Sequence, residues 1–157
     1  MDPFRFSPIK TQRELIEAVK YIASQTENLS QKIIGIKLSI SSLTVFSHYE
    51  DEFAELKNIL LELGEPYDEN NGPRIKFNKP IIINGNSIRY LRIRKPDSNR
   101  PQVGCNDFEV DSYKQFKELY LKDHPENLRL IKRPEYEMIE FFDSEFDVLA
   151  YVVSDVS

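Results

Sequence analysis

The spacing of apolar positions predicts a helix near the start of the chain. Thr11 and Glu14 stand at the three-residue spacing of a capping box, and Gly35 suits the end of a helix. One helical face between them is apolar and carries Leu15, Ile16, Val19, Ile22 and Ala23. The pattern therefore predicts one long helix that ends at Gly35.

The next predicted elements form a strand–helix–strand–strand–strand unit, which begins with the β-branched and aromatic run 41–47, typical of a strand. Ser47 and Glu50 again have capping-box spacing, and a helix is predicted to follow until Gly64 and Pro66. The apolar stripe of that helix consists of Phe53, Leu56, Ile59, Leu60 and Leu63. A turn at 68–72 and three strands at 74–78, 80–84 and 87–95 complete the unit.

The same order of elements is then repeated. A strand is predicted at 104–110, Asp111 is a candidate cap for a helix over 112–121, and strands follow at 128–132, 136–142 and 146–153. We predict an α+β fold with two βαβββ modules, Ser42–Lys95 and Val103–Asp155, after an N-terminal helix region of residues 1–41. All 157 residues are expected to form a single domain. An ordinary α+β sandwich without an internal repeat is the open alternative.

Composition and charge exclude several classes of protein. The formal net charge of -5 disfavours nucleic-acid binding, which depends on cations that neutralise phosphates. The single cysteine, Cys105, excludes an internal disulfide and a cysteine-rich zinc site. The chain shows neither an apolar run long enough to span a membrane nor a secretory signal at its start, so we expect a cytoplasmic protein without a membrane partner.

The doubled βαβββ unit resembles the vicinal oxygen chelate superfamily, which includes glyoxalase I, extradiol dioxygenases and bleomycin-resistance proteins. The resemblance covers about Ser42 to Val153, and the stretch MIEFFDSEFDVLAYVV at 138–153 is similar to the closing hairpin of that superfamily. It implies that each module curls its sheet around a cavity. It also implies metal ligands on the first and last strands of the modules.

The metal ligands of such a site are scarce in this chain. It has two histidines, and neither face of the last strand offers a ligand. The best set is weak and consists of His48, Asp107 and Glu140. We therefore predict no standard metal site and no cofactor. Cys105 lies in an acidic neighbourhood that opposes formation of a thiolate, so it is not expected to be a nucleophile.

The best candidate for a functional site is an arginine-rich strand and the loop after it. Arg92 and Arg94 share one face of the strand, opposite Leu91 and Ile93. Guanidinium groups bind carboxylate or phosphate through paired hydrogen bonds. The predicted ligand-binding residues are Tyr90, Arg92, Arg94, Arg100, Gln102 and Asp107. The alternative is that these arginines form ordinary ion pairs with the acidic residues of the chain.

These observations predict a domain that binds a small anionic ligand, with vicinal-oxygen-chelate-like architecture but no standard metal site. A protein–protein interaction module is the first alternative, and a metal-dependent lyase or dioxygenase-like enzyme is the second. Whether the protein is an enzyme stays open. An exposed outer strand would also allow a homodimer through the edges of the sheets.

Overall fold

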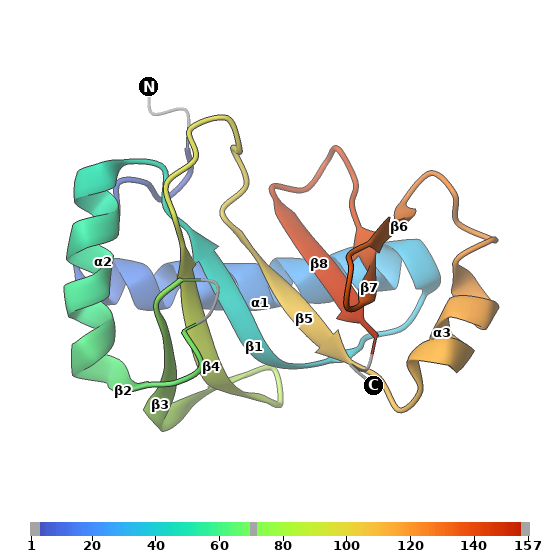
Figure 1. Ribbon diagram of the computed structural model, residues 1–157, viewed down its shortest axis with the longest axis horizontal. Helices are drawn as coiled ribbons and strands as arrows, with labels where there is room; N and C mark the ends of the chain where they lie inside the picture. The colour runs from blue at the N-terminus through green and yellow to red at the C-terminus, as the bar shows by residue number, and fades with distance from the viewer. Residues whose placement is uncertain (1–3, 70–71, 155–157) are drawn as a thin grey trace.

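The computed structural model describes residues 4–69 and 72–154, and its strands form one mixed sheet (Figure 1). The elements are α1 (Gln12–Ile34), β1 (Ser39–Phe46), α2 (Glu50–Leu63), β2 (Gly64–Pro66), β3 (Arg74–Ile83), β4 (Asn86–Arg94), β5 (Gly104–Glu109), α3 (Tyr113–Tyr120), β6 (Leu128–Lys132), β7 (Glu137–Phe141) and β8 (Val148–Val153). The eight strands lie in the order β2-β3-β4-β1-β5-β8-β7-β6. Within the described ranges, no helix is both long and apolar enough to cross a membrane.

The strand order repeats about the centre of the sheet. β1 and β5 pair antiparallel there, and each also pairs in parallel with the last strand of its own module, β4 or β8. The outer strands follow in the same sequence on both sides. The predicted fold class, α+β with two βαβββ modules and an additional N-terminal helix, is thereby confirmed. Residues 70–71 of the predicted turn and residue 155 of the predicted second module lie outside the described residues.

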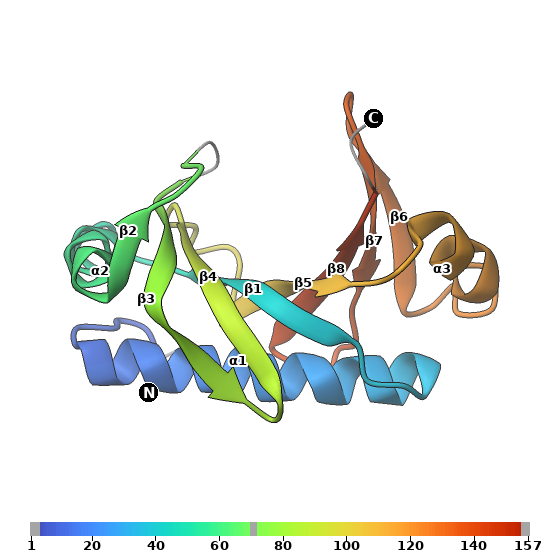
Figure 2. The same cartoon turned by 90° about the horizontal axis from the view of Figure 1, so that it is seen from below.

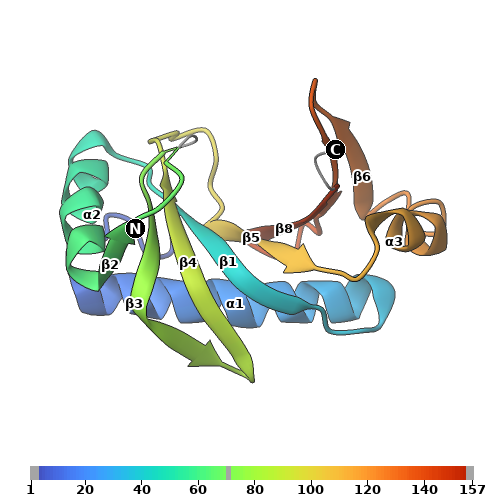
Figure 3. The ribbon, with the colours of Figure 1, turned by 60° about the horizontal axis from the view of Figure 1, so that its bottom comes forward.

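Helix α1 covers one face of the sheet across both modules, and the ends of the sheet curve away from it (Figures 2 and 3). The predicted caps are present, since Thr11 Oγ1 accepts a hydrogen bond from the Glu14 amide and Gly35 has φ of 80°. Leu15, Ala18, Val19 and Ile22 are fully buried. The other face of the sheet, opposite α1, is called the concave face below.

The other two helices flank the sheet at its two ends (Figure 2). α2 buries Leu56, Ile59 and Leu60 and contacts β2, β3 and β4. α3 is anchored by Phe116, whose ring centroid lies 5.9 Å from that of Phe141 on β7. Burial of an aromatic or a leucine side chain contributes roughly 1.5 to 3 kcal/mol, so each helix is held mainly by one apolar stripe.

Several predicted boundaries are wrong in the first module. The segments 74–78 and 80–84 form a single strand, β3, with an irregular register between Lys76 and Ile81. Proline is tolerated at such an irregularity because its missing N–H is not needed for the ladder, which explains why Pro80 does not divide the strand. Three strands still follow α2, because the short β2 comes directly after the helix and pairs with β3 from Gly64 to Pro66.

Two predicted helix caps are also wrong. Ser47 donates its hydroxyl to the Arg94 carbonyl, and Tyr49 takes the N-cap position of α2 without a side-chain hydrogen bond. Asp111 does not cap α3, because the adjacent Ser112 accepts the Gln115 amide. In each case a neighbour one or two positions away occupies the N-cap, and the sequence spacing alone does not distinguish the two arrangements.

Candidate functional site

The polar side chains of β4 lie on the concave face. Leu91 and Ile93 are fully buried, while Tyr90, Arg92 and Arg94 are half-buried on the opposite side of the strand. This placement follows from strand alternation. The structure therefore brings three of the predicted ligand-binding residues to one surface.

Strand pairing extends this surface across both modules in two rows of side chains. One row runs through Arg74, Arg92, Thr44, Cys105 and Leu149. The next runs through Tyr90, Ser42, Asp107, Tyr151 and Glu140. Because directly paired residues of neighbouring strands point to the same side of a sheet, the rows place arginines from the first module beside acidic and phenolic groups from the second.

Arg92 and Arg94 have few protein partners. Within residues 4–69 and 72–154 neither forms an ion pair with a carboxylate, and the Nε of both, as well as Nη2 of Arg94, is buried without a hydrogen-bond acceptor. The guanidinium carbon of Arg94 lies 3.4 Å from the centroid of the Phe46 ring. Burial lowers the pKa of both arginines, with further lowering of Arg92 by Arg74 and of Arg94 by Arg100. Both groups remain cationic, since arginine loses its proton only far above neutral pH.

Arg74 is a site residue that the sequence analysis missed. Its guanidinium lies between the rings of Tyr67 and Tyr90, at 5.2 Å and 5.0 Å, and Nη2 donates to Ser42 Oγ at 3.2 Å. Its Nη1 approaches Asp68 at 3.8 Å, while its Nε is buried without an acceptor. The alternation of Arg74 with the buried Ile75 indicates that Arg74 points away from the core. It does not show which strand lies next to β4, so the sequence alone does not place Arg74 beside Arg92.

Asp107 and Cys105 belong to β5, and their side chains lie on the same face of the sheet as the arginines of β3 and β4. Asp107 is accessible to solvent from the open side of the concave face, yet the surrounding protein raises the pKa of its carboxyl, and Arg92 and Arg74 oppose that rise. Burial, followed by the charge of Asp107, raises the pKa of the Cys105 thiol to about 12. A thiol of that pKa is protonated at neutral pH, so Cys105 is a neutral part of the surface.

Glu140 belongs to a hydrogen-bonded chain in the second module. Its carboxylate is 5% exposed and accepts from Arg129 Nη2 and from the Tyr151 hydroxyl, the latter at 2.9 Å. Burial raises the pKa of Tyr151, which keeps the hydroxyl protonated as a donor. Glu140 is thus neutralised by Arg129 and is not available to Arg92 or Arg94.

Arg100 and Gln102 lie on the loop between β4 and β5, where they line a cavity of about 420 Å³. Arg129, Glu140 and Leu149 line it from the second module. Arg100 is exposed and lies 3.9 Å from Asp97, whereas Gln102 Oε1 is buried without a donor. The cavity adjoins the concave face through Leu149, which pairs in register with Cys105, but Tyr90 and Arg92 are not among its lining residues.

His48 lies apart from the two rows. It is 4% exposed, and its ring stacks on Phe4 with centroids 3.9 Å apart. Nε2 is 3.2 Å from the Gln102 carbonyl, which can only accept, so Nε2 carries the proton and Nδ1 accepts from the Ser7 hydroxyl at 2.6 Å. Within the described part of the chain, no three histidine, cysteine, aspartate or glutamate side chains are grouped to hold a metal ion. His48, Asp107 and Glu140 are therefore not brought together.

The buried environment of His48 predicts an acid-sensitive contribution to stability. Burial lowers its pKa below 6.5, although Glu52 opposes that shift. As the pH falls below 6.5 the unfolded chain takes up a proton before the folded one does, so the free energy of unfolding falls. We expect the wild type to lose stability between about pH 7 and pH 5 more steeply than His48→Gln, as measured by urea unfolding. Equal slopes for the two proteins would contradict a buried neutral His48.

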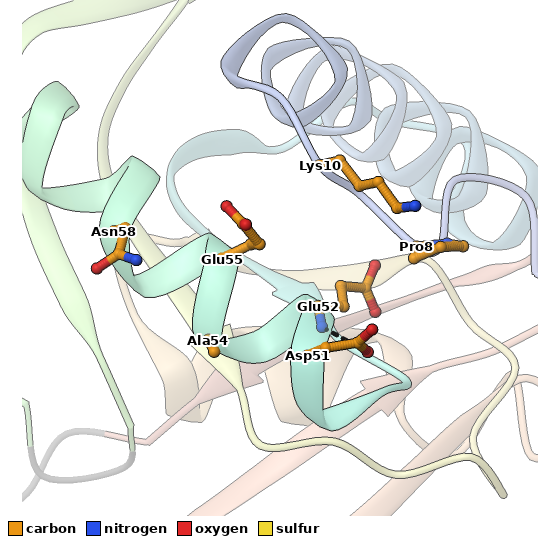
Figure 4. Close-up of a pocket in the computed structure, with 7 residues that line it drawn as sticks. All are labelled: Pro8, Lys10, Asp51, Glu52, Ala54, Glu55 and Asn58. Atoms are coloured by element: carbon orange, nitrogen blue, oxygen red, sulfur yellow. Dashed lines mark hydrogen bonds between the residues drawn. The ribbon is translucent and has the colours of Figure 1, made fainter.

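A separate hollow of about 450 Å³ lies between the N-terminal segment and α2 (Figure 4). It is lined by Pro8, Lys10, Asp51, Glu52, Ala54, Glu55 and Asn58. Glu52 already accepts the Ile9 and His48 amides, both at 2.7 Å. With three carboxylates and one lysine in its lining, this hollow repels anions. We therefore place the candidate anion site on the concave face.

Comparison with known proteins shows the fold alone. No protein-family model matches the chain, and no curated protein matches it. The solved structure of a structural-genomics protein designated EC4020 matches with a TM-score of 0.70 at 11% identity, over 98% of this chain and 94% of that one. A structure of Streptomyces coelicolor methylmalonyl-CoA epimerase in complex with 2-nitronate-propionyl-CoA has a TM-score of 0.42 at 14% identity, over 77% of this chain and 100% of that one.

Proposed function

We propose that the protein binds a small carboxylate or phosphate anion on the concave face. The observation that carries the proposal is the state of Arg92 and Arg94, whose buried N–H groups have no acceptor and whose charges have no ion-pair partner in the described part of the chain. A half-buried charge without a partner is costly, and a bound anion would supply the missing partner. Arg74 adds a third guanidinium beside them.

The alternative that these arginines are structural ion-pair partners has less support. Arg129 is such a residue, since it donates to the buried Glu140. Arg92 and Arg94 differ from it because Asp107 and Asp97, which influence them electrostatically together with Asp68, form no hydrogen bond with either guanidinium.

The architecture supports a vicinal-oxygen-chelate-like protein, but the donor set does not suit the metal of that superfamily. The positions where the resemblance implies ligands carry Thr44, Arg92, Arg94, Asp107 and Tyr151 on the concave face, and the Cys105 thiol is held protonated. Asp107 is the one carboxylate among these residues. Cationic and phenolic groups are poor ligands for a divalent cation. We therefore propose a binding function that does not use a metal.

Metal analysis gives an independent prediction. The purified full chain, prepared without chelator, is expected to hold far less than one equivalent of zinc, iron or manganese by inductively coupled plasma mass spectrometry. The reason is that the histidine and carboxylate groups among residues 4–69 and 72–154 do not converge. About one equivalent of any of these metals, lost on His48→Ala, would overturn the assignment.

The anion proposal is tested with acetate and inorganic phosphate as probes. Either or both are expected to raise the melting temperature of the wild type at constant ionic strength, and Arg92→Ala is expected to abolish the rise while the free protein remains folded. Arg89→Ala is the matched control, because Arg89 is an exposed arginine of the same strand. If no carboxylate or phosphate compound stabilises the wild type, and Arg92→Ala merely lowers stability, the proposal fails.

The interaction-module alternative lacks a specific supporting observation. The large hydrophobic side chains that are exposed among the described residues are Ile36, Leu61, Tyr67, Ile82 and Leu119. They come from five separate segments rather than from one strand or helix. Scattered exposed apolar residues are ordinary on a protein surface. A homodimer through the terminal strands β2 and β6 stays a prediction, which light scattering at high protein concentration tests.

A further inference from the structure

The charge on the concave face exceeds what one monovalent anion would neutralise. Arg74, Arg92 and Arg94 supply three guanidinium groups there, and Asp107 is a carboxylate on β5, on the far side of β1 from β4. Asp68 approaches Arg74 at 3.8 Å and also acts on Arg92, but its side chain is 51% exposed, so solvent screens its charge. Glu140 is neutralised by Arg129 and does not reduce the surplus.

The guanidinium groups are divided between two positions. Arg92 is paired in register with Arg74 on β3, and each of these residues has a buried Nε without an acceptor. Arg94 lies over Phe46 on β1, the other neighbour of β4, and Arg100 is a second cation that acts on it. Arg92 and Arg94 are two residues apart on one strand, so their backbones are separated by about 7 Å.

We propose that the ligand is a short dicarboxylate, with one carboxylate at Arg92 and Arg74 and the other at Arg94 and Arg100. This inference rests on the proposed anion-binding function and adds the class of ligand. A single carboxylate satisfies one guanidinium with two parallel hydrogen bonds and leaves the second position unpaired. Two carboxylates joined by a short chain satisfy both, and the chain of about four to six carbons follows from the strand spacing.

The surface between the two positions suits such a connecting chain. Thr44 pairs with Arg92 and is two residues from Phe46, the partner of Arg94, and Cys105, which pairs with Thr44, acts electrostatically on both arginines. Cys105 is a protonated thiol and behaves as a small apolar group, and Thr44 is half-buried. Neither residue adds a charge that would oppose a methylene chain.

The test is isothermal titration calorimetry of the full chain at fixed ionic strength with acetate, propionate, malonate, succinate, glutarate, adipate and inorganic phosphate. Succinate, glutarate or adipate is expected to bind at least about tenfold more tightly than acetate, propionate or phosphate. Arg94→Ala should reduce the affinity for the best dicarboxylate to about that of propionate. Circular dichroism confirms that the variant is folded, and Arg89→Ala serves as the unaffected control.

The outcomes separate this inference from the proposed function. If a monocarboxylate or phosphate binds as tightly as every dicarboxylate, the dicarboxylate inference is wrong while anion binding stands. Dicarboxylate binding that is insensitive to Arg94→Ala also overturns it. If none of the seven compounds binds, both the inference and the proposed anion-binding function fail.

Discussion

Gly104→Ala is expected to lower the free energy of unfolding by about 3 kcal/mol, the cost of overpacking a filled interior. Gly104 begins β5 at the centre of the sheet, where α1 crosses it. A Cβ at this position would overlap the Thr44 carbonyl and come within 2.5 Å of Ile22 Cδ1. The carbonyl is part of the β1–β5 ladder, so relief requires a shift of backbone or of α1. Urea unfolding followed by far-ultraviolet circular dichroism measures the effect.

Gly35→Ala is the matched control for this substitution. Gly35 ends α1 with φ of 80°, and a Cβ there would meet nothing within 4 Å. Gly35→Ala is expected to lower the free energy of unfolding by about 1 kcal/mol, and this cost comes only from placing a side chain on left-handed backbone. If Gly104→Ala costs no more than Gly35→Ala, α1 does not pack directly against the start of β5.

Arg94→Met is expected to have opposite effects on binding and on stability. Affinity for the anionic ligand should fall about 100-fold, because a buried charge pair contributes about 3 kcal/mol or more to binding. The free protein should become about 1 kcal/mol more stable, because an apolar side chain replaces a buried cation with orphaned donors. Calorimetry with the tightest-binding anion and urea unfolding of the free protein measure the two quantities.

Arg89→Met provides the control for this prediction, since Arg89 is exposed on the same strand and should change neither quantity. Loss of stability with unchanged affinity in Arg94→Met would assign Arg94 a structural role. Stacking on Phe46 would then be its main contribution.

Much of this fold was accessible from the sequence because its determinants are local. The cap at Thr11, the end at Gly35 and the alternation of Leu91 and Ile93 with the arginines of β4 depend on residues close together in the chain. β2 and the single long β3 were not predicted. β2 has only three residues, too few to give a clear pattern. A proline such as Pro80 ordinarily marks the end of a strand, but here the pairing of β3 with β4 is irregular and the strand continues.

Only the part of the candidate site that lies on one strand, β4, was predicted from the sequence. Tyr90, Arg92 and Arg94 were identified together because alternation places them on one face. Arg74 lies beside them because β3 pairs with β4. Glu140 is not available to these arginines because it forms an ion pair with Arg129 of β6. Those relations depend on register between strands, which composition and periodicity do not determine.

The central claim is that Arg92 and Arg94 bind an anion, and side-chain NMR tests it most directly. The Nε–Hε signals of the arginines are recorded in the wild type, with Arg92→Lys and Arg94→Lys used for assignment. The account predicts that titration with succinate moves the Arg92 and Arg94 signals together to saturation at one dissociation constant, while the Arg89 signal stays in place. If neither succinate nor inorganic phosphate saturates an arginine signal, or if both move only exposed arginines such as Arg89, the concave face is not the anion site.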